Sequence, residues 1–141
     1  MTDPRTMSDQ DFITAFLDSS MPAAGFDHQG HVRAAWILLQ RHPLDQAIAL
    51  GCDGIARLAA RLGVPDKYHR SLSEALMRLM AAGGASRADL PWPDFLAANR
   101  PLMDDALGLL ARHYSPERLA TAEARRSFVA PDRQPLPPCA R

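Results

Sequence analysis

The chain has little of several features that mark particular classes of protein. Of its 141 residues only 2 are cysteines, and the spacing of Cys52 and Cys139 matches neither a zinc knuckle nor a redox pair. Basic and acidic residues balance at 16 each, and Lys67 is the only lysine. A neutral chain lacks the overall attraction that dedicated nucleic-acid or membrane-surface binders use. We therefore expect neither kind of partner.

Long apolar runs are also absent. The longest, residues 34–39, is far shorter than the roughly 20 apolar residues that span a bilayer. The first residues show no basic-then-apolar signal pattern. These two observations predict a cytoplasmic protein. Cys52 fits this prediction as a small buried apolar side chain.

Helical periodicity and capping residues are present instead. The length and the 47% apolar fraction suit one globular domain, and no strand-like alternation occurs. We predict an all-α, single-domain bundle over residues 1–141, with about four main helices and short additional C-terminal helices. Residues 1–7 are expected to be flexible, and prolines predict an extended tail over residues 130–141. The expected helices cover residues 8–18, 27–41, 44–63, 66–82, 94–98 and 101–113, followed by two short turns that begin at Ser115 and Thr121.

Capping residues set the starts of these helices. Ser8 and Asp27 are good N-caps, and Asp66 is expected to cap the fourth main helix. Gly51 and Gly54 weaken the third helix but let a neighbour approach closely. The apolar stripe of this helix is expected to consist of Ile48, Cys52, Ile55, Leu58, Ala59 and Leu62. Gly83 and Gly84 end the fourth.

Three histidines form the most informative constellation. His28 and His31 lie three residues apart in the first turn of the second helix, so they share a side. His69 lies in the first turn of the fourth helix. Each begins an apolar stripe, and in an up-down-up-down bundle these two helices are parallel, so the imidazoles would converge at one end of the core. Three histidines with an open position are typical of a catalytic metal site.

Neighbouring residues complete this hypothesis. Tyr68 and Arg33 flank the histidines and are our candidate catalytic residues, as a proton donor and an anion-binding group. Zinc, iron, manganese and copper all accept imidazole, so the divalent ion is not distinguished, and no organic cofactor is indicated. The alternative interpretation is structural: His28 and His31 cap a helix, and His69 is a hydrogen-bonded core residue. Glu74 lies off the His69 stripe, and we expect it on a solvated face.

Three segments resemble an uncharacterised family of small bacterial helical proteins. Residues 26–36 resemble its F-x-H-x-x-H-[LV]-R-x-A-W opening, residues 67–69 its K-Y-H segment, and residues 114–137 its Y-S-P-E-R-L and P-D-x-x-P-L-P signature. The resemblance implies that His28, His31 and His69 are its motif histidines and that the tail packs on the domain. The family segment often continues K-Y-H-E-T, whereas this chain has Arg70-Ser71. If the glutamate there is a ligand or a base, this chain lacks it, which counts against an enzymatic role. No activity comes with the resemblance.

The sequence leaves three functions open. The first is a metal-dependent enzyme or metal-binding protein that uses the three histidines. The second is a non-catalytic helical interaction module, with Trp92 between Pro91 and Pro93 as the feature to examine. The third and weakest is nucleic-acid binding through a basic strip, for which the candidate residues are Arg57, Arg61, Arg70 and Arg78. Substrate, protein partner and oligomeric state are not determined by the sequence.

Overall fold

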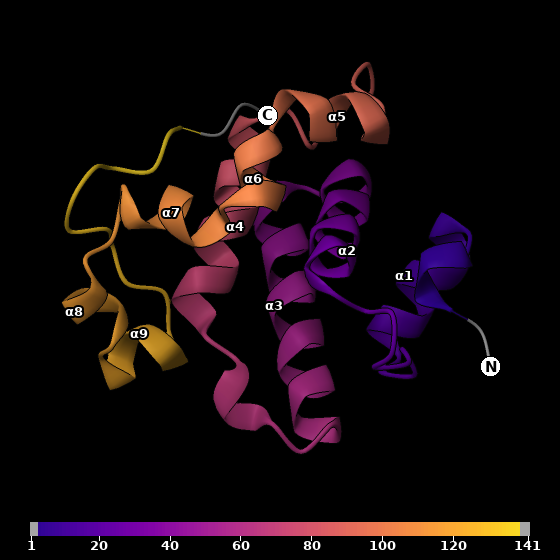
Figure 1. Cartoon of the computed structure of the whole chain (residues 1–141), viewed down its shortest axis with the longest axis horizontal. Coiled ribbons are helices and arrows are strands. Elements are labelled where there is room, and N and C mark those ends of the chain that lie inside the picture. Colours follow the sequence, from indigo (N-terminus) through magenta and orange to yellow (C-terminus); the bar gives the residue numbers. More distant parts are fainter. Residues whose placement is uncertain (1–2, 139–141) are drawn as a thin grey trace. The chain divides into compact units, whose positions relative to one another are not determined.

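The computed structural model describes residues 3–138, and all regular structure in that range is helical (Figure 1). The all-α prediction is confirmed. The chain divides between Tyr68 and His69 into two compact units, which we call the N-terminal unit and the C-terminal unit. No helix within residues 3–138 is long and apolar enough to cross a membrane.

Within residues 3–68, the N-terminal unit contains three α-helices and two short 3-10 helices. Its elements are η1 (Pro4–Thr6), α1 (Asp9–Leu17), α2 (His28–Arg41), α3 (Leu44–Arg61) and η2 (Pro65–Lys67). Ser8 and Asp27 act as the predicted N-caps, because their side chains accept hydrogen bonds from the amides of Asp11 and Gly30. Residues 1–7 were expected to be flexible. Within that range residues 4–6 form η1, and residues 1–2 lie outside the described part of the chain.

Helices α2 and α3 pack side by side, and α1 packs against both (Figure 1). The core between them is built from buried apolar side chains of all three helices: Phe12, Phe16, Val32, Leu38, Ile48 and Cys52. Gly54 permits the close approach predicted for α3. A Cβ atom on Gly54 would come within 2.4 Å of the Phe16 ring, so no larger residue fits without movement.

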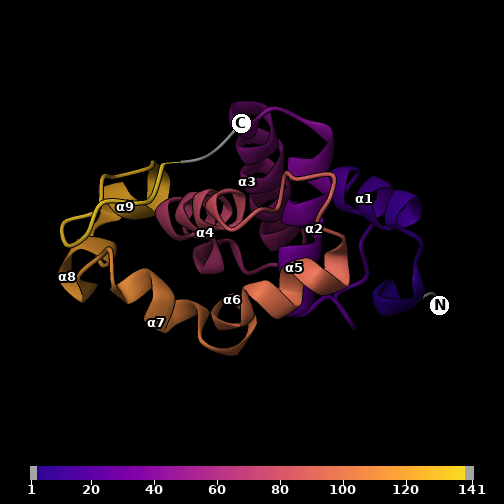
Figure 2. The same cartoon turned by 90° about the horizontal axis from the view of Figure 1, so that it is seen from above.

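The described part of the C-terminal unit, residues 69–138, has one long helix and five short ones. These are α4 (Arg70–Ala82), α5 (Trp92–Ala98), α6 (Arg100–Asp104), α7 (Ala106–Ala111), α8 (Pro116–Leu119) and α9 (Ala122–Arg126). Figure 2 shows α5 to α8 as a run of short helices that passes along α4, and both α7 and α9 contact α4. Ser115 and Thr121 cap α8 and α9 as predicted.

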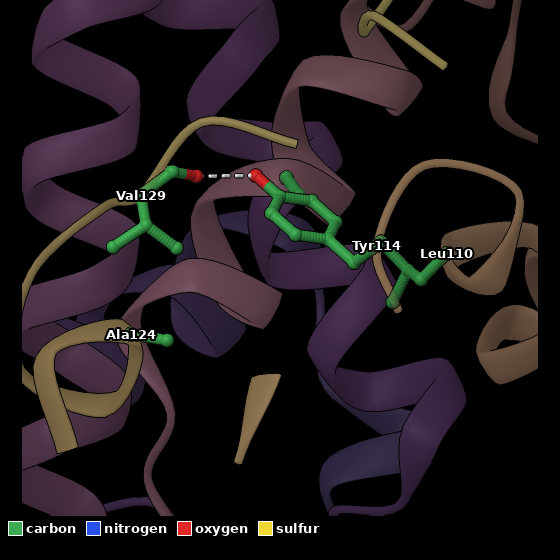
Figure 3. Close-up of a cluster of buried hydrophobic side chains, with 5 residues drawn as sticks. Leu110, Tyr114, Ala124 and Val129 are labelled. Atoms are coloured by element: carbon green, nitrogen blue, oxygen red, sulfur yellow. Dashed lines mark hydrogen bonds between the residues drawn. The ribbon is translucent and has the colours of Figure 1, made fainter. Parts of the chain in front are cut away.

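Residues 127–138, which include the start of the predicted tail, pack on this unit, and the Arg133 amide donates to the His113 carbonyl at 2.9 Å. Tyr114 is fully buried in an apolar cluster, and its hydroxyl donates a 2.7 Å hydrogen bond to the Val129 carbonyl (Figure 3). Ser71 on α4 donates to the Ser127 carbonyl at 2.9 Å and accepts from the Val129 amide at 3.1 Å. Residues 130–138 contain no helix or strand, and Cys139 lies outside the described residues.

Two predicted helix boundaries are wrong. Asp66 does not cap the fourth main helix: it lies in η2, and α4 is capped by His69, whose Nδ1 accepts from the Leu72 amide at 3.2 Å. The helix predicted over residues 101–113 is broken at Asp105. The Asp105 side chain accepts from the Gly108 amide at 3.1 Å and so starts a new helix there. The four-helix bundle itself stays a prediction, because α1 to α3 belong to one unit and α4 to the other.

Candidate functional site

His28 and His31 lie in the first turn of α2, as predicted, and both are exposed. The His31 ring packs against the Phe26 ring with 4.7 Å between centroids. Within the described part of the chain, no residue forms a hydrogen bond with the His31 ring nitrogens. The ring nitrogens of His31 are therefore available for another molecule.

His69 is used differently. It is 7% exposed, and both of its ring nitrogens are bonded inside the C-terminal unit. Nδ1 accepts from the Leu72 amide, so Nε2 carries the proton and donates to the Leu119 carbonyl at 2.8 Å. A metal ligand needs a free nitrogen lone pair, which His69 does not have in this arrangement. Among residues 3–138, no group of three or more His, Cys, Asp or Glu side chains is placed to hold a metal ion.

Arg33, a candidate catalytic residue, holds the N-terminal segment to α2. Its guanidinium donates to Asp9 at 2.8 Å, to the Met7 carbonyl at 2.8 Å and to the Pro4 carbonyl at 3.3 Å. It also lies 4.3 Å from the centre of the Phe12 ring. These contacts occupy the donors that Arg33 would need to bind an anionic substrate.

Glu74, expected on a solvated face, is instead 6% exposed. One carboxylate oxygen accepts from Arg70 and the other from Arg78, with shortest distances of 3.0 and 2.8 Å. Arg78 also lies over the Phe128 ring, at 5.2 Å. The sequence reasoning missed this cluster because it treated the three side chains of α4 separately, although they follow one another at i, i+4 spacing.

The arginines proposed for a basic strip are also engaged. Arg70 and Arg78 pair with Glu74, while Arg57 and Arg61 donate to the carbonyls of Leu17 and Met21. Each guanidinium thus has a structural partner within its own unit.

Tyr68, the other candidate catalytic residue, lines a cavity of about 290 Å³ in the N-terminal unit. His31 lines the same cavity, from α2. The remaining wall comes from the loop before α2, from one side of α3 and from the segment after it: Ala23, Phe26, Ile55, Leu58, Ala59, Leu62, Val64 and Lys67. The structure therefore brings two of the five predicted site residues together around one cavity.

Apolar side chains left open to solvent mark this cavity. Within residues 3–138 three large apolar side chains are exposed, and two of them, Leu62 at 41% and Val64 at 36%, line it. Leu62 was predicted to continue the buried stripe of α3, and that prediction is wrong. Single exposed apolar residues are ordinary, but a pair beside a concave apolar wall is typical of a binding site.

Three polar side chains accompany this wall. His31 is exposed on one side, while protein atoms surround the others. This desolvation lowers the pKa of His31 below its ordinary 6.5. His28 lowers the pKa further by a smaller amount, and Asp27 raises it. The imidazole is therefore neutral at pH 7. Lys67 is exposed, and no carboxylate within the described part of the chain forms an ion pair with it. The sequence analysis gave Lys67 no role, although its being the only lysine was a signal.

Comparisons with known proteins add no assignment. No family model, curated protein or solved structure matches this chain. The candidate site is therefore argued from its own residues.

Proposed function

We propose that the N-terminal unit binds a small organic molecule with a largely apolar body in the cavity next to His31, Lys67 and Tyr68. One observation carries this proposal: the cavity combines exposed Leu62 and Val64 with His31 and Lys67, whose ring nitrogens and ammonium group form no hydrogen bond or ion pair within residues 3–138. An apolar concave wall with a few convergent polar groups is the usual form of a small-molecule site.

The size of the cavity limits the molecule. If a water molecule takes up about 30 Å³ of liquid, a cavity of about 290 Å³ holds a ligand of about ten non-hydrogen atoms. A single aromatic ring with one substituent has this size. The proposal assigns binding and no reaction.

Filling the cavity tests the proposal. Ala59 lines it on α3, whereas its neighbour Ala60 is exposed and does not. We expect neutral benzamide to shift NMR signals of residues around the cavity in the full chain. The Ala59→Phe variant should lose this response, and the matched Ala60→Phe variant should keep it.

A second variant guards against misfolding, because overpacking at Ala59 costs about 1–3 kcal/mol. Val64→Trp adds bulk at an exposed position of the rim, where no core has to move. It should also weaken benzamide binding. Unchanged binding in both folded variants, or no response in the wild type to any of several neutral or charged one-ring compounds, would overturn the proposal.

The three-histidine metal centre and the interaction module stay predictions. The hydrogen bonds of His69 favour a structural role for that residue. Trp92 begins α5 and packs against Phe95, with 6.3 Å between ring centroids. Neither observation supports these functions as directly as the cavity supports ligand binding.

A further inference from the structure

The polar side chains of the cavity share a chemical property that points to the charge of its ligand. Lys67 carries three N–H donors, neutral His31 one, and Tyr68 a hydroxyl, so every polar side chain in the lining can donate a hydrogen bond. No carboxylate lines the cavity. An occupant with acceptor oxygens is therefore matched, whereas a cationic occupant is not.

Lys67 gives this lining a net positive charge. It lies in η2 at the edge of the cavity, exposed and without an ion pair to any carboxylate in the part of the chain that the structure describes. Its neighbour Asp66 is also exposed but does not line the cavity. One ammonium group attracts one negative charge, whereas a doubly charged phosphate is usually met by several cationic or amide donors.

The rest of the wall sets the remainder of the ligand. Ile55, Leu58, Leu62 and Val64 offer an aliphatic surface, and Phe26 adds an aromatic ring beside His31. Together with the cavity volume, these residues fit a compact apolar body of one ring.

We propose that the ligand of this cavity is a small monocarboxylate with a compact apolar body, held through its carboxylate by Lys67 and by the imidazole of His31. This inference rests on the proposed function, since it requires that the cavity binds a small molecule. Tyr68 contributes a third group at the same wall.

Three compounds of the same shape test the inference: benzoate is an anion, benzamide is neutral and benzamidine is a cation. Titrated into the full chain, benzoate should bind about five- to tenfold more tightly than benzamide, and benzamidine most weakly. Added salt should weaken the binding of benzoate and leave the binding of benzamide unchanged, because salt screens the charge of a solvent-exposed ammonium group.

Variants then assign the effect to Lys67. Lys67→Gln should reduce the affinity for benzoate to that for benzamide, and Lys67→Arg should restore the preference for benzoate over benzamide. Arg100→Gln removes an exposed positive charge from the C-terminal unit and should change neither affinity. His31→Phe keeps a ring against Phe26 but removes the N–H donor, so it should weaken benzoate more than benzamide.

The outcomes separate this inference from the proposed function. If none of the three compounds binds, the proposed function fails and the inference fails with it. If benzamide binds as tightly as benzoate, or if Lys67→Gln leaves their ratio unchanged, the cavity binds small molecules but the carboxylate assignment is wrong.

Discussion

Polar side chains in the core of the C-terminal unit and polar side chains at the cavity of the N-terminal unit are used in opposite ways. In the C-terminal unit, buried Glu74 accepts from two arginines, both nitrogens of His69 are bonded, and Tyr114 donates to the Val129 carbonyl. In the N-terminal unit, His31 and Lys67 stand beside an open apolar cavity, and within residues 3–138 neither the His31 ring nitrogens nor the Lys67 ammonium group has a hydrogen-bond or ion-pair partner.

This difference separates stabilising residues from candidate ligand-binding residues. A buried polar group whose bonds are all made within the protein stabilises one conformation and has nothing left for a ligand. A polar group at a cavity wall that the fold does not use is free to select one. The same residue type, histidine, illustrates both cases, in His69 and in His31.

The largest effect is expected at Glu74. Glu74→Ala leaves Arg70 and Arg78 without their shared carboxylate. Removing one partner of a buried ion pair is costly, but both arginine side chains keep nearly a third of their surface exposed, so water compensates part of the loss. We therefore expect a loss of about 2–4 kcal/mol in the free energy of unfolding. The chain has one tryptophan in each unit, so Trp92 fluorescence in a Trp36→Phe background reports urea unfolding of the C-terminal unit. The exposed Glu123→Ala is the control and should cost under about 0.5 kcal/mol. A loss that small for Glu74→Ala would show that the cluster adds no stability.

A smaller loss is expected at Tyr114. Tyr114→Phe removes one hydroxyl and leaves the Val129 carbonyl unpaired, which should cost about 1–2 kcal/mol by the same fluorescence measurement.

Burial also raises the pKa of Tyr114 to about 12. In the unfolded chain the pKa of this phenol is 10.0, so the unfolded state loses the proton first as the pH rises. The free energy of unfolding of the wild type should therefore be unaffected by this group below pH 10 and should fall between pH 10 and about 12.

The chain has only two tyrosines, which makes that titration readable. In a Tyr68→Phe background the phenolate absorbance comes from Tyr114 alone and should develop well above pH 10. Ordinary titration near pH 10 in the folded protein would show that the hydroxyl is accessible to water and that the tail does not pack as described.

His69 tests the comparison against the metal hypothesis. His69→Ala removes an N-cap and the bond to Leu119, so the C-terminal unit should lose about 1 kcal/mol, and His69→Asn should regain the capping part. We expect elemental mass spectrometry to find the same metal content in His69→Ala as in the wild type. Near-stoichiometric metal that disappears in a folded His69→Ala, and also in His28→Ala, would instead establish the three-histidine centre.

Local signals in the sequence predicted most of the helices. Ser8, Asp27, Ser115 and Thr121 cap the helices expected of them, because an N-cap bond involves residues only two or three apart. The two wrong helix boundaries also depend on local structure. Asp66 and Asp105 are both good capping residues, and only the backbone conformation around each decides whether a helix begins there.

The candidate site was predicted less well. His31 and Tyr68 were singled out, but as parts of a metal centre, and the cavity they share was not foreseen. The cavity lies where the neighbouring helices of the N-terminal unit, within residues 3–68, leave the end of α3 uncovered. Helical periodicity assigned Leu62 to the apolar stripe of α3, but periodicity does not show whether another element packs over that residue. Lys67 had no motif. Its role follows only from its position beside that wall.

The smallest effect, and the sharpest test of the N-terminal unit, concerns the pH dependence given by His31. Its pKa in the folded protein lies below the ordinary 6.5, so below about pH 6.5 the unfolded state binds more protons than the folded state. Stability of the N-terminal unit should therefore fall as the pH drops below that value. Trp36 fluorescence in a Trp92→Phe background measures this, and His31→Gln should flatten the slope.

The neighbours of His31 separate its own titration from a general acid effect. Burial lowers the pKa of His31, His28 lowers it further, and Asp27 raises it. His28→Gln should therefore raise the pKa that NMR measures for the His31 ring, and Asp27→Asn should lower it further. A His31 that titrates at 6.5 in all three proteins would mean that water surrounds the ring, which would remove the desolvated wall from which the cavity proposal is argued.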